Sequence, residues 1–320
     1  MHPPEPIALT GLDGGNPLGF IAAIGLLRVL VEARPVDGVR PRLRWRLAGT
    51  WRPVIDAGMD RDAVIDAVLA HARGALADPA LTWGYDDDGH LVEEEEIKVR
   101  DLKPLPTALR RLQDSAAARA CGLAVGPTRR RSVDLVGAFG NELATANDGR
   151  VKPHALHFTA GQQRLLTMVR DIAQGIQRVD VEEALFGPWK NASALPNLSW
   201  NAGASRLYAL RAGNPAKDKR GGVPAADWLG FSAWPLLPVA AVGSRLHTAL
   251  FRGGWKDGSL YWPLWAVPAT AFTVRALITA YPERLSPAQR TARGIDAVMR
   301  AGILRSDQGG YGSFSPAEVL

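Results

Sequence analysis

The strongest pattern of apolar positions in the chain runs from Asn16 to Val31, where apolar residues cover nearly every face of a helix. A helix that is apolar all round is normally buried inside a sizeable domain. Asn16 can cap its N-terminus, and Pro17 suits the first helical position because it has no backbone N–H to lose. Gly19 and Gly25 disfavour a helix, so we expect another backbone to approach closely there. This segment is predicted to be the central core helix.

Two further patterns follow this helix. Leu43–Val54 alternates apolar and polar residues around Ala48-Gly49-Thr50, which predicts a β-hairpin. Asp60–Leu76 has the spacing of an amphipathic helix, and Pro6–Leu9 predicts a short strand before the first helix. Outward positions of the hairpin carry four arginines: Arg42, Arg44, Arg46 and Arg52.

The second half of the chain mixes helices with short strands. Thr159–Ile176 is predicted to be a helix, because Thr159 and Gln162 have the spacing of a capping box. Asp180 and Glu183 repeat that spacing. Further helices are expected at Thr107–Ala120, Ala269–Ala280 and Pro287–Ala301, and strands at Arg206–Arg211, Leu236–Val242, Arg245–Phe251 and Leu260–Trp265. The Gly/Ser-rich tail Gln308–Leu320 is expected to be loose.

Together these patterns predict an α+β fold, with mixed helices and short antiparallel strands around a buried N-terminal helix. A chain of 320 residues is long enough for one large domain or two moderate ones. We expect an N-terminal part, residues 1–150, that holds the central helix and a basic segment, and a C-terminal α+β part, residues 151–320.

Composition adds a mild basic character to this picture. The formal net charge is +6, which permits a polyanionic partner without requiring one. The single cysteine, Cys121, allows no intramolecular disulfide and suits a reducing cytoplasm. The first apolar run is interrupted by Arg28 and lacks the flanks of a signal peptide. We therefore expect a cytoplasmic protein with no membrane partner.

Charge along the chain changes abruptly near residue 97. Tyr85–Glu96 contains seven acidic residues and no lysine or arginine, whereas Lys98–Arg131 contains nine basic residues and two acidic ones. The acidic stretch is expected to be a solvated loop. Binding of a divalent cation by its carboxylates is the alternative, because hard cations take oxygen ligands.

Candidate catalytic residues are few. The sequence contains no GxSxG, HExxH or Walker motif, and Gly11–Pro17 (GLDGGNP) lacks both the GxGxxG spacing and a P-loop lysine. His154 and His157 are close in sequence, but no third ligand has the spacing of a zinc site. No catalytic residue, metal or cofactor is therefore predicted, and we expect a protein that is not an enzyme.

Three basic clusters support contact with a nucleic acid: the Lys98–Arg131 block, the Arg/Trp hairpin and the Lys/Arg-rich loop Gly213–Gly222. Each could instead be a solvated charged face, with the tryptophans in the core. Gln162–Arg164 would occupy the first turn of a helix, where free N–H groups favour phosphate and glutamine can read a base edge, although Gln162 could simply cap the helix. The candidate contact residues are Lys98, Arg100, Lys103, Arg110, Arg111, Arg129, Arg130, Arg131, Gln162, Gln163, Arg164, Lys217, Lys219 and Arg220.

The opening LDGGNPLGFIAAIGLLRVL resembles the N-terminus of accessory and large-subunit-like proteins encoded in type I-G (formerly I-U) CRISPR–Cas loci. Further similar stretches are LRWRLAGTWRPV, HFTAGQQRLLTMVRDIA, EALFGPWKN with LSWN and RLYALRA, and WPLW followed by the helix at Thr273–Ile278. The resemblance extends in patches over about residues 9 to 280. These stretches look like packing and turn motifs, and none is a catalytic signature.

The resemblance implies a non-catalytic subunit of a type I CRISPR–Cas antiviral surveillance complex. Its implied partners are guide RNA, target DNA, the other subunits and the recruited helicase–nuclease. In such systems base pairing reads the sequence, while protein reads a short duplex motif and the backbones. Two alternatives stay open: a protein-only adaptor that recruits the helicase–nuclease, and a nuclease whose metal is held by the acidic loop, where changing Asp86, Asp87 and Asp88 to Asn would abolish cleavage.

Overall fold

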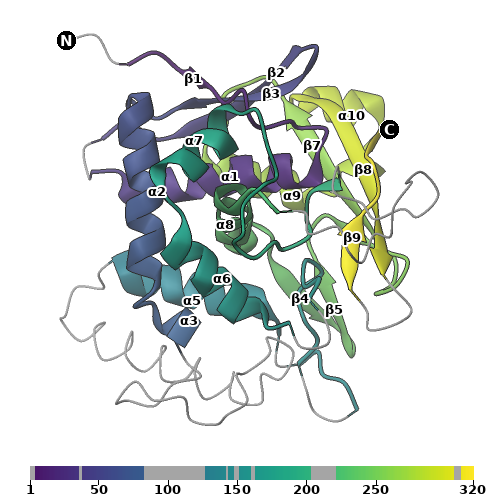
Figure 1. The fold of residues 1–320 in the computed structure, drawn as a ribbon. Coiled ribbons are helices and arrows are strands. Elements are labelled where there is room, and N and C mark those ends of the chain that lie inside the picture. The colour runs from purple at the N-terminus through teal and green to yellow at the C-terminus, as the bar shows by residue number, and fades with distance from the viewer. Residues whose placement is uncertain are drawn as a thin grey trace, which may run out of the picture.

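The computed structural model describes residues 4–35, 38–82, 127–141, 143–147, 151–159, 163–202, 221–305 and 311–320. Its helices and antiparallel sheets form an α+β fold, as predicted (Figure 1). Within these ranges no helix is long and apolar enough to cross a membrane. The predicted helix Thr107–Ala120, the strand Arg206–Arg211 and the acidic loop lie outside the described residues.

Helix α1 (Pro17–Ala33) runs through the middle of the molecule, as its apolar pattern predicted (Figure 1). The Asn16 side chain caps this helix by accepting a 3.0 Å hydrogen bond from the Leu18 N–H. The close approach expected at Gly25 is present, because a Cβ there would lie 1.8 Å from the Leu229 carbonyl oxygen. Both the burial of α1 and the reason for its glycine are thus confirmed.

The backbone that approaches α1 belongs to α8 (Pro224–Ser232), a helix that the sequence pattern did not predict. Every residue of α8 is buried. Its sequence therefore lacks the alternation between an apolar and a polar face by which a helix is recognised. Helices α1 and α8 together form the centre around which the other elements pack.

Further helices surround this pair: α2 (Arg61–Ala75), α3 (Pro79–Thr82), α5 (Pro127–Phe139), α6 (Leu165–Gly175) and α7 (Arg178–Phe186). Helix α2 is confirmed, with Asp60 as its N-cap. Helix α6 begins later than predicted, so the capping box at Thr159 is wrong, and Thr159 is instead buried beside His157. In α7 the capping box is formed by Gln177 and Asp180, one turn earlier than expected.

The predicted hairpin is confirmed. It consists of β2 (Arg42–Ala48) and β3 (Thr50–Asp56), and β1 (Ile7–Ala8) joins it to give the strand order β1-β3-β2. Gly49 at the tip has φ +74°, a left-handed conformation that glycine adopts without strain. The local sequence was therefore sufficient to set the register of this sheet.

A second antiparallel sheet has the order β10-β8-β7-β6, with β9 also paired to β8. Its strands are β6 (Phe251–Arg252), β7 (Ser259–Trp265), β8 (Ile295–Arg305), β9 (Gly312–Phe314) and β10 (Glu318–Val319). The predicted helix Pro287–Ala301 is wrong in its second half, because α10 ends at Ala292 and β8 follows. The tail expected to be loose supplies β9 and β10.

The remaining described elements are η5 (Trp234–Leu236), β4 (Val239–Val242), β5 (Arg245–Thr248), α9 (Ala271–Thr279), η6 (Pro282–Arg284) and α10 (Pro287–Ala292). The hairpin is connected to the second half through Leu43 and Ala269, which exchange backbone hydrogen bonds of 2.8 and 2.9 Å. Strand β4 starts later than predicted because a 3₁₀ turn precedes it.

One hydrophobic cluster extends through the described residues from Leu9 to Phe314. The predicted division near residue 150 falls between α5 and α6, and both of these helices contribute to the cluster. Six tryptophans are among its largest fully buried side chains: Trp45, Trp200, Trp228, Trp234, Trp262 and Trp265. Trp45 of the Arg/Trp hairpin is therefore a core residue.

Candidate nucleic-acid interface

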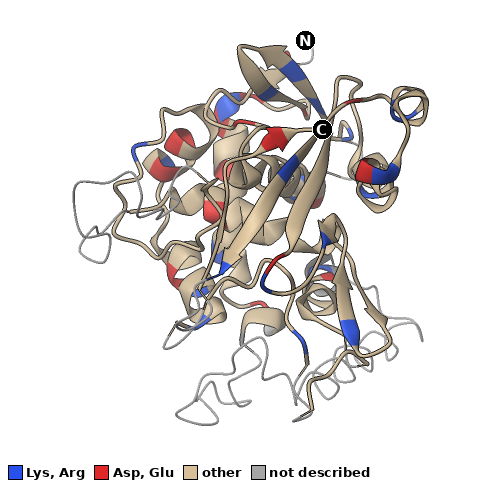
Figure 2. Cartoon of the chain, turned by 90° about the vertical axis from the view of Figure 1, so that its right-hand side faces the viewer, with Lys and Arg blue, Asp and Glu red and all other residues tan. Residues whose placement is uncertain are grey.

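The β2 strand carries a row of arginines on one face, of which Arg42 and Arg46 are exposed and Arg44 is half-buried. Arg42, Arg44 and Arg46, here called the β2 arginine row, alternate with Leu43 and Trp45, which are buried. Successive side chains of a strand point to opposite faces, so the row occupies the outer face of the hairpin. Within the part of the chain that the structure describes, none of the three arginines has an ion-pair partner. Figure 2 shows basic residues on the hairpin at the top of the molecule.

The inner face of the hairpin is held by aromatic contacts with the core. The Trp45 ring lies stacked 6.0 Å from Phe20 of α1 and meets Trp265 edge-on at 6.2 Å. The Trp265 Nε1–H donates a 2.8 Å hydrogen bond to the Leu43 carbonyl. Aromatic pairs in these geometries stabilise a fold beyond the area they bury. These contacts fix the strand and therefore the direction in which the β2 arginine row points.

Arg52, the fourth outward arginine of the hairpin, has a different role. It lies directly opposite Arg46 in the strand register, where two like charges repel each other. Its Nη1–H groups donate hydrogen bonds of 2.8 Å to the Thr10 carbonyl and 3.0 Å to the Leu12 carbonyl. Arg52 thus binds the segment before α1. Of the four hairpin arginines, those of the β2 arginine row are therefore the ones available to contact another molecule.

The arginine run at the start of α5 is partly internal. The Arg131 Nε–H donates a 2.8 Å bond to Asp78 Oδ2, and the Ser132 hydroxyl donates a 2.6 Å bond to the other carboxylate oxygen. The Arg131 and Asp78 side chains are only 11% and 2% exposed. Because its charge is neutralised inside the fold, Arg131 no longer belongs among the candidate contacts.

Most of the other predicted contacts lie outside the described residues. The α5 backbone includes Arg129 and Arg130, whose side chains are outside the description. Gln163 and Arg164 precede α6, so their expected position in the first turn of that helix is wrong. Arg164 is its N-cap residue and makes no side-chain cap bond. The contacts outside the described residues are Lys98, Arg100, Lys103, Arg110, Arg111, Gln162, Lys217, Lys219 and Arg220.

A buried ionic group ties α1 to its neighbours. Arg28 Nη2 lies 2.6 Å from Glu32 Oε1, and His71 Nε2 lies 3.2 Å from Glu32 Oε2. Arg28 also donates a 3.1 Å hydrogen bond to the Ser232 carbonyl of α8. Burial lowers the pKa of His71 although the hydrogen bond and charge of Glu32 oppose it, so the imidazole is neutral at pH 7. The geometry of this group is that of a structural connection between helices.

Asp227 of α8 is an ionisable group that the sequence pattern did not single out. It is buried, and neither carboxylate oxygen has a hydrogen-bond partner among the described residues. Burial raises the pKa of Asp227 to about 8, against a smaller opposing effect of the Leu198 backbone. The carboxyl group is therefore mostly protonated at pH 7. Its raised pKa results from the packing of α8 in the centre of the fold.

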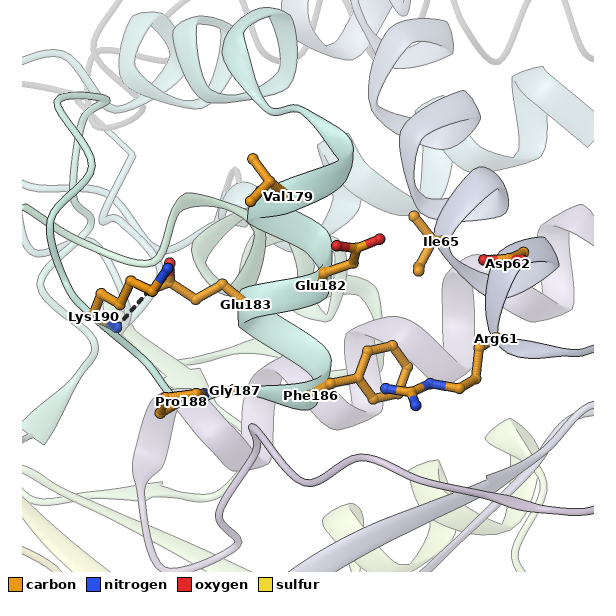
Figure 3. Close-up of a pocket in the computed structure, with 10 residues that line it drawn as sticks. All are labelled: Arg61, Asp62, Ile65, Val179, Glu182, Glu183, Phe186, Gly187, Pro188 and Lys190. Atoms are coloured by element: carbon orange, nitrogen blue, oxygen red, sulfur yellow. Dashed lines mark hydrogen bonds between the residues drawn. The ribbon is translucent and has the colours of Figure 1, made fainter.

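An open groove of about 510 Å³ lies between α2 and α7 (Figure 3). Its apolar lining includes Val179 and Phe186, and the Arg61 guanidinium lies over the Phe186 ring, 3.7 Å from the ring centroid. Glu183 Oε1 accepts a 2.6 Å hydrogen bond from the Lys190 N–H. The volume is in the range of small-ligand sites. The charged side chains around the groove therefore decide whether it could support catalysis or only binding.

The acidic side chains of this groove are already engaged. Arg178 forms ion pairs with Asp62, Asp66 and Glu182, at 3.1 Å for the last two. Because Glu183 is also hydrogen-bonded, the lining residues offer no free carboxylate pair of the kind that acid–base catalysis uses. The groove is better suited to contact with a molecular surface than to chemistry.

The described residues bring together no group of three or more His, Cys, Asp or Glu that could hold a metal ion. His154 is fully buried, with its ring stacked 4.2 Å from that of Trp234, and burial lowers its pKa to about 3. His157 is buried as well. Cys121 and the acidic loop, residues 86–96, lie outside the described residues, so a metal site in that loop stays an alternative to the predicted solvated loop.

No protein-family model matches this chain, and no curated protein matches it either. Support for the candidate interface therefore comes from its own residues.

Proposed function

We propose that the protein is a non-catalytic subunit of a type I CRISPR–Cas surveillance complex that contacts guide RNA or target DNA through the β2 arginine row. One observation carries the nucleic-acid part of this proposal: three arginines on the outer face of a rigid strand have no ion-pair partner among the described residues. The identity of the complex is supported by the sequence resemblance alone.

The chemistry of the row suits a phosphate backbone. A guanidinium group presents a planar fork of N–H donors that matches two phosphate oxygens. Each neutralised phosphate also releases bound counterions, which favours association. Asp56 faces Arg42 across the hairpin, so the outer face keeps an excess of positive charge. The row therefore provides affinity for a polyanion without reading its sequence.

The groove between α2 and α7 favours a second candidate function, that of an adaptor for the helicase–nuclease. Val179 is an exposed apolar residue at this groove, and Phe186 lies half-buried beside it. Apolar surface surrounded by charged side chains is typical of protein-docking sites. A chain that binds its protein partners but neither RNA nor DNA would be such an adaptor.

The triple variant Arg42→Ala, Arg44→Ala, Arg46→Ala tests the first function. We expect weaker binding of RNA and DNA, with a slope of log affinity against log salt that is smaller by about 2 to 3, because each lost phosphate contact removes roughly 0.7 to 0.9 from it. Fluorescence anisotropy at several salt concentrations measures this slope.

Lysine at the same three positions is the matched control, because it keeps the charge and should keep the slope. If the alanine variant is folded by circular dichroism and its slope equals that of the wild type, the row does not contact phosphates. Binding of the helicase–nuclease without nucleic-acid affinity would support the adaptor, and Val179→Asp should then weaken that binding.

A further inference from the structure

A second set of exposed side chains lies along α9. Phe272, at 84%, is the most exposed large hydrophobic residue of the described chain. Arg275 and Thr279 are also exposed, and Arg275 has no ion-pair partner within the described residues. Positions i, i+3 and i+7 lie on one side of a helix. These three side chains therefore share a solvent-facing surface, while Val274 on the other side packs into the core.

Tyr281, just after α9, has an unusual backbone conformation. Its φ of 55° and ψ of 64° are in the left-handed region, which is rare and costly for a bulky residue. The residue is 41% exposed. Two guanidinium groups lie near its ring, that of Arg252 at 4.3 Å and that of Arg284 at 5.5 Å from the centroid. Strain of this kind is concentrated at functional sites.

Contacts behind Tyr281 keep its ring in place. The Arg252 Nε–H donates a 2.7 Å bond to Glu283 Oε1, and Arg252 Nη1 lies 3.3 Å from His247 Nε2. The His247 ring lies nearly parallel to that of Tyr281, with centroids 6.1 Å apart. Arg284 approaches Glu283 only to 3.7 Å, and its side chain is 71% exposed. The cluster thus offers one ring and one accessible cation to solvent.

The exposed surface of α9 adjoins the hairpin. Ala269, shortly before α9, pairs with Leu43 of β2 through two backbone hydrogen bonds. The start of α9 therefore lies beside the β2 arginine row, and Tyr281 lies about 14 Å away at its other end, from a rise of 1.5 Å per residue. From the hairpin through the start of α9 to its end, the cations and aromatic rings come in the order Arg46, Arg44, Arg42, Phe272, Arg275, Tyr281 and Arg284.

We propose that this line of residues is a track for a single-stranded nucleic acid. Bases stack on Phe272 and Tyr281, and Arg275 and Arg284 bind the phosphates between and beyond them. The inference rests on the proposed function and adds the strandedness of the ligand. Aromatic rings next to cations are the usual means by which proteins hold unpaired bases. In a duplex the bases already stack on one another, so exposed rings would gain no partner.

Phe272→Ala tests the track, because this exposed ring contributes little to the core. We expect affinity for a short thymidine or uridine oligonucleotide to fall about fivefold to a hundredfold, as the loss of one stacked base implies. Affinity for a short DNA duplex should not change. Fluorescence anisotropy at one salt concentration measures the affinity for each of the three probes: the thymidine oligonucleotide, the uridine oligonucleotide and the DNA duplex. Tyr281→Ala should act in the same direction, and Phe272→Trp should retain binding because it keeps a ring.

Val267→Ala is the matched control, since it removes an exposed apolar side chain that cannot stack on a base. A loss confined to the thymidine or to the uridine probe supports the track and identifies the strand as DNA or RNA. No loss with Phe272→Ala, or an equal loss for the duplex, overturns the track. If the β2 arginine row still sets the salt dependence in that case, the proposed function survives. If the wild type binds no nucleic acid, both inferences fall.

Discussion

Asp227 makes the stability of the fold depend on pH through a single side chain. In the folded protein burial raises the pKa of its carboxyl group from 3.8 to about 8. The unfolded chain therefore releases this proton first as the pH rises. The contribution of Asp227 to the free energy of unfolding is complete below pH 3.8 and is lost as the pH rises to about 8.

Asp227→Asn should therefore increase the free energy of unfolding, with a gain that grows from about pH 4 to pH 8 and then levels off. The amide is neutral at every pH, so the variant avoids the cost of keeping a carboxyl group protonated. At the upper end the gain should be on the order of 1 to 4 kcal/mol. Urea unfolding across this pH range measures it. If the free energies of unfolding of the wild type and the variant differ by the same amount at every pH, the buried carboxyl group is not neutral in the folded protein.

Gly25 is required by the approach of two backbones. A Cβ at this position would lie 1.8 Å from the Leu229 carbonyl oxygen, which belongs to α8 and cannot turn aside. Gly25→Ala should lower the free energy of unfolding by about 3 kcal/mol, as overpacking of a core does. Thermal or urea unfolding measures the change.

Gly137→Ala in α5 is the matched control, because a Cβ there meets nothing within 4 Å. It should raise the free energy of unfolding by about 0.5 to 1 kcal/mol, since alanine favours a helix. Equal effects of the two substitutions would mean that α1 and α8 do not approach each other as described.

At the scale of elements, two kinds of ion pair connect the helices: one that is buried and one that is exposed to solvent. The Arg131–Asp78 pair connects α5 to the turn before α3 and is nearly inaccessible to solvent. The pairs of Arg178 join α7 to α2, but that side chain is 44% exposed. Because water and salt screen exposed pairs, the two kinds should differ in their contribution to stability.

Arg131→Ala should lower the free energy of unfolding by about 3 to 5 kcal/mol, because it removes a guanidinium that pairs with the buried carboxylate of Asp78. Arg178→Ala, which also breaks ion pairs, should cost less than about 1 kcal/mol. Guanidinium chloride would screen the pairs, so urea is the suitable denaturant. Similar losses for both variants would show that Arg131 is more exposed than the structure has it.

Elements differ in how far their own residues determine them. The β2–β3 hairpin was predictable because its alternation and Gly49 are local features. Strand β8 was not, because its pairing with β7 decides its conformation, and β7 begins 36 residues earlier in the chain. Helix α8 was not predictable either, because it is buried on all sides and its sequence therefore shows no amphipathic pattern.

Across the whole molecule, the two candidate surfaces differ in charge. The groove side, at the left of Figure 1, carries four acids beside its cations Arg61, Arg178 and Lys190, whereas the β2 arginine row carries cations alone; the acids are Asp62, Asp66, Glu182 and Glu183. The β2 arginine row belongs to the hairpin at the top of Figure 1, and the start of α9 adjoins that hairpin through the pairing of Ala269 with Leu43. An uneven distribution of charge can orient an approaching polyanion. A nucleic acid would accordingly meet the hairpin and α9 before the groove.

The candidate interface was only partly predictable from sequence. Alternation along β2 placed its arginines on the outer face, and the structure agrees. The same reasoning could not show that Arg52 turns back to backbone carbonyls or that Arg131 pairs with Asp78. Phe272 gave no signal at all, because one aromatic residue in a short helix is more often part of a core.

The sequence by itself determined the buried central helix, the hairpin and the outward direction of its arginines, because these follow from periodicity and capping within a few residues. Only the tertiary structure decided which cations remain open. A charge run shows how many arginines are present, but the acid that neutralises one of them can lie more than fifty positions away, as Asp78 does for Arg131. Whether an arginine can meet a phosphate is therefore set by the packing of distant elements.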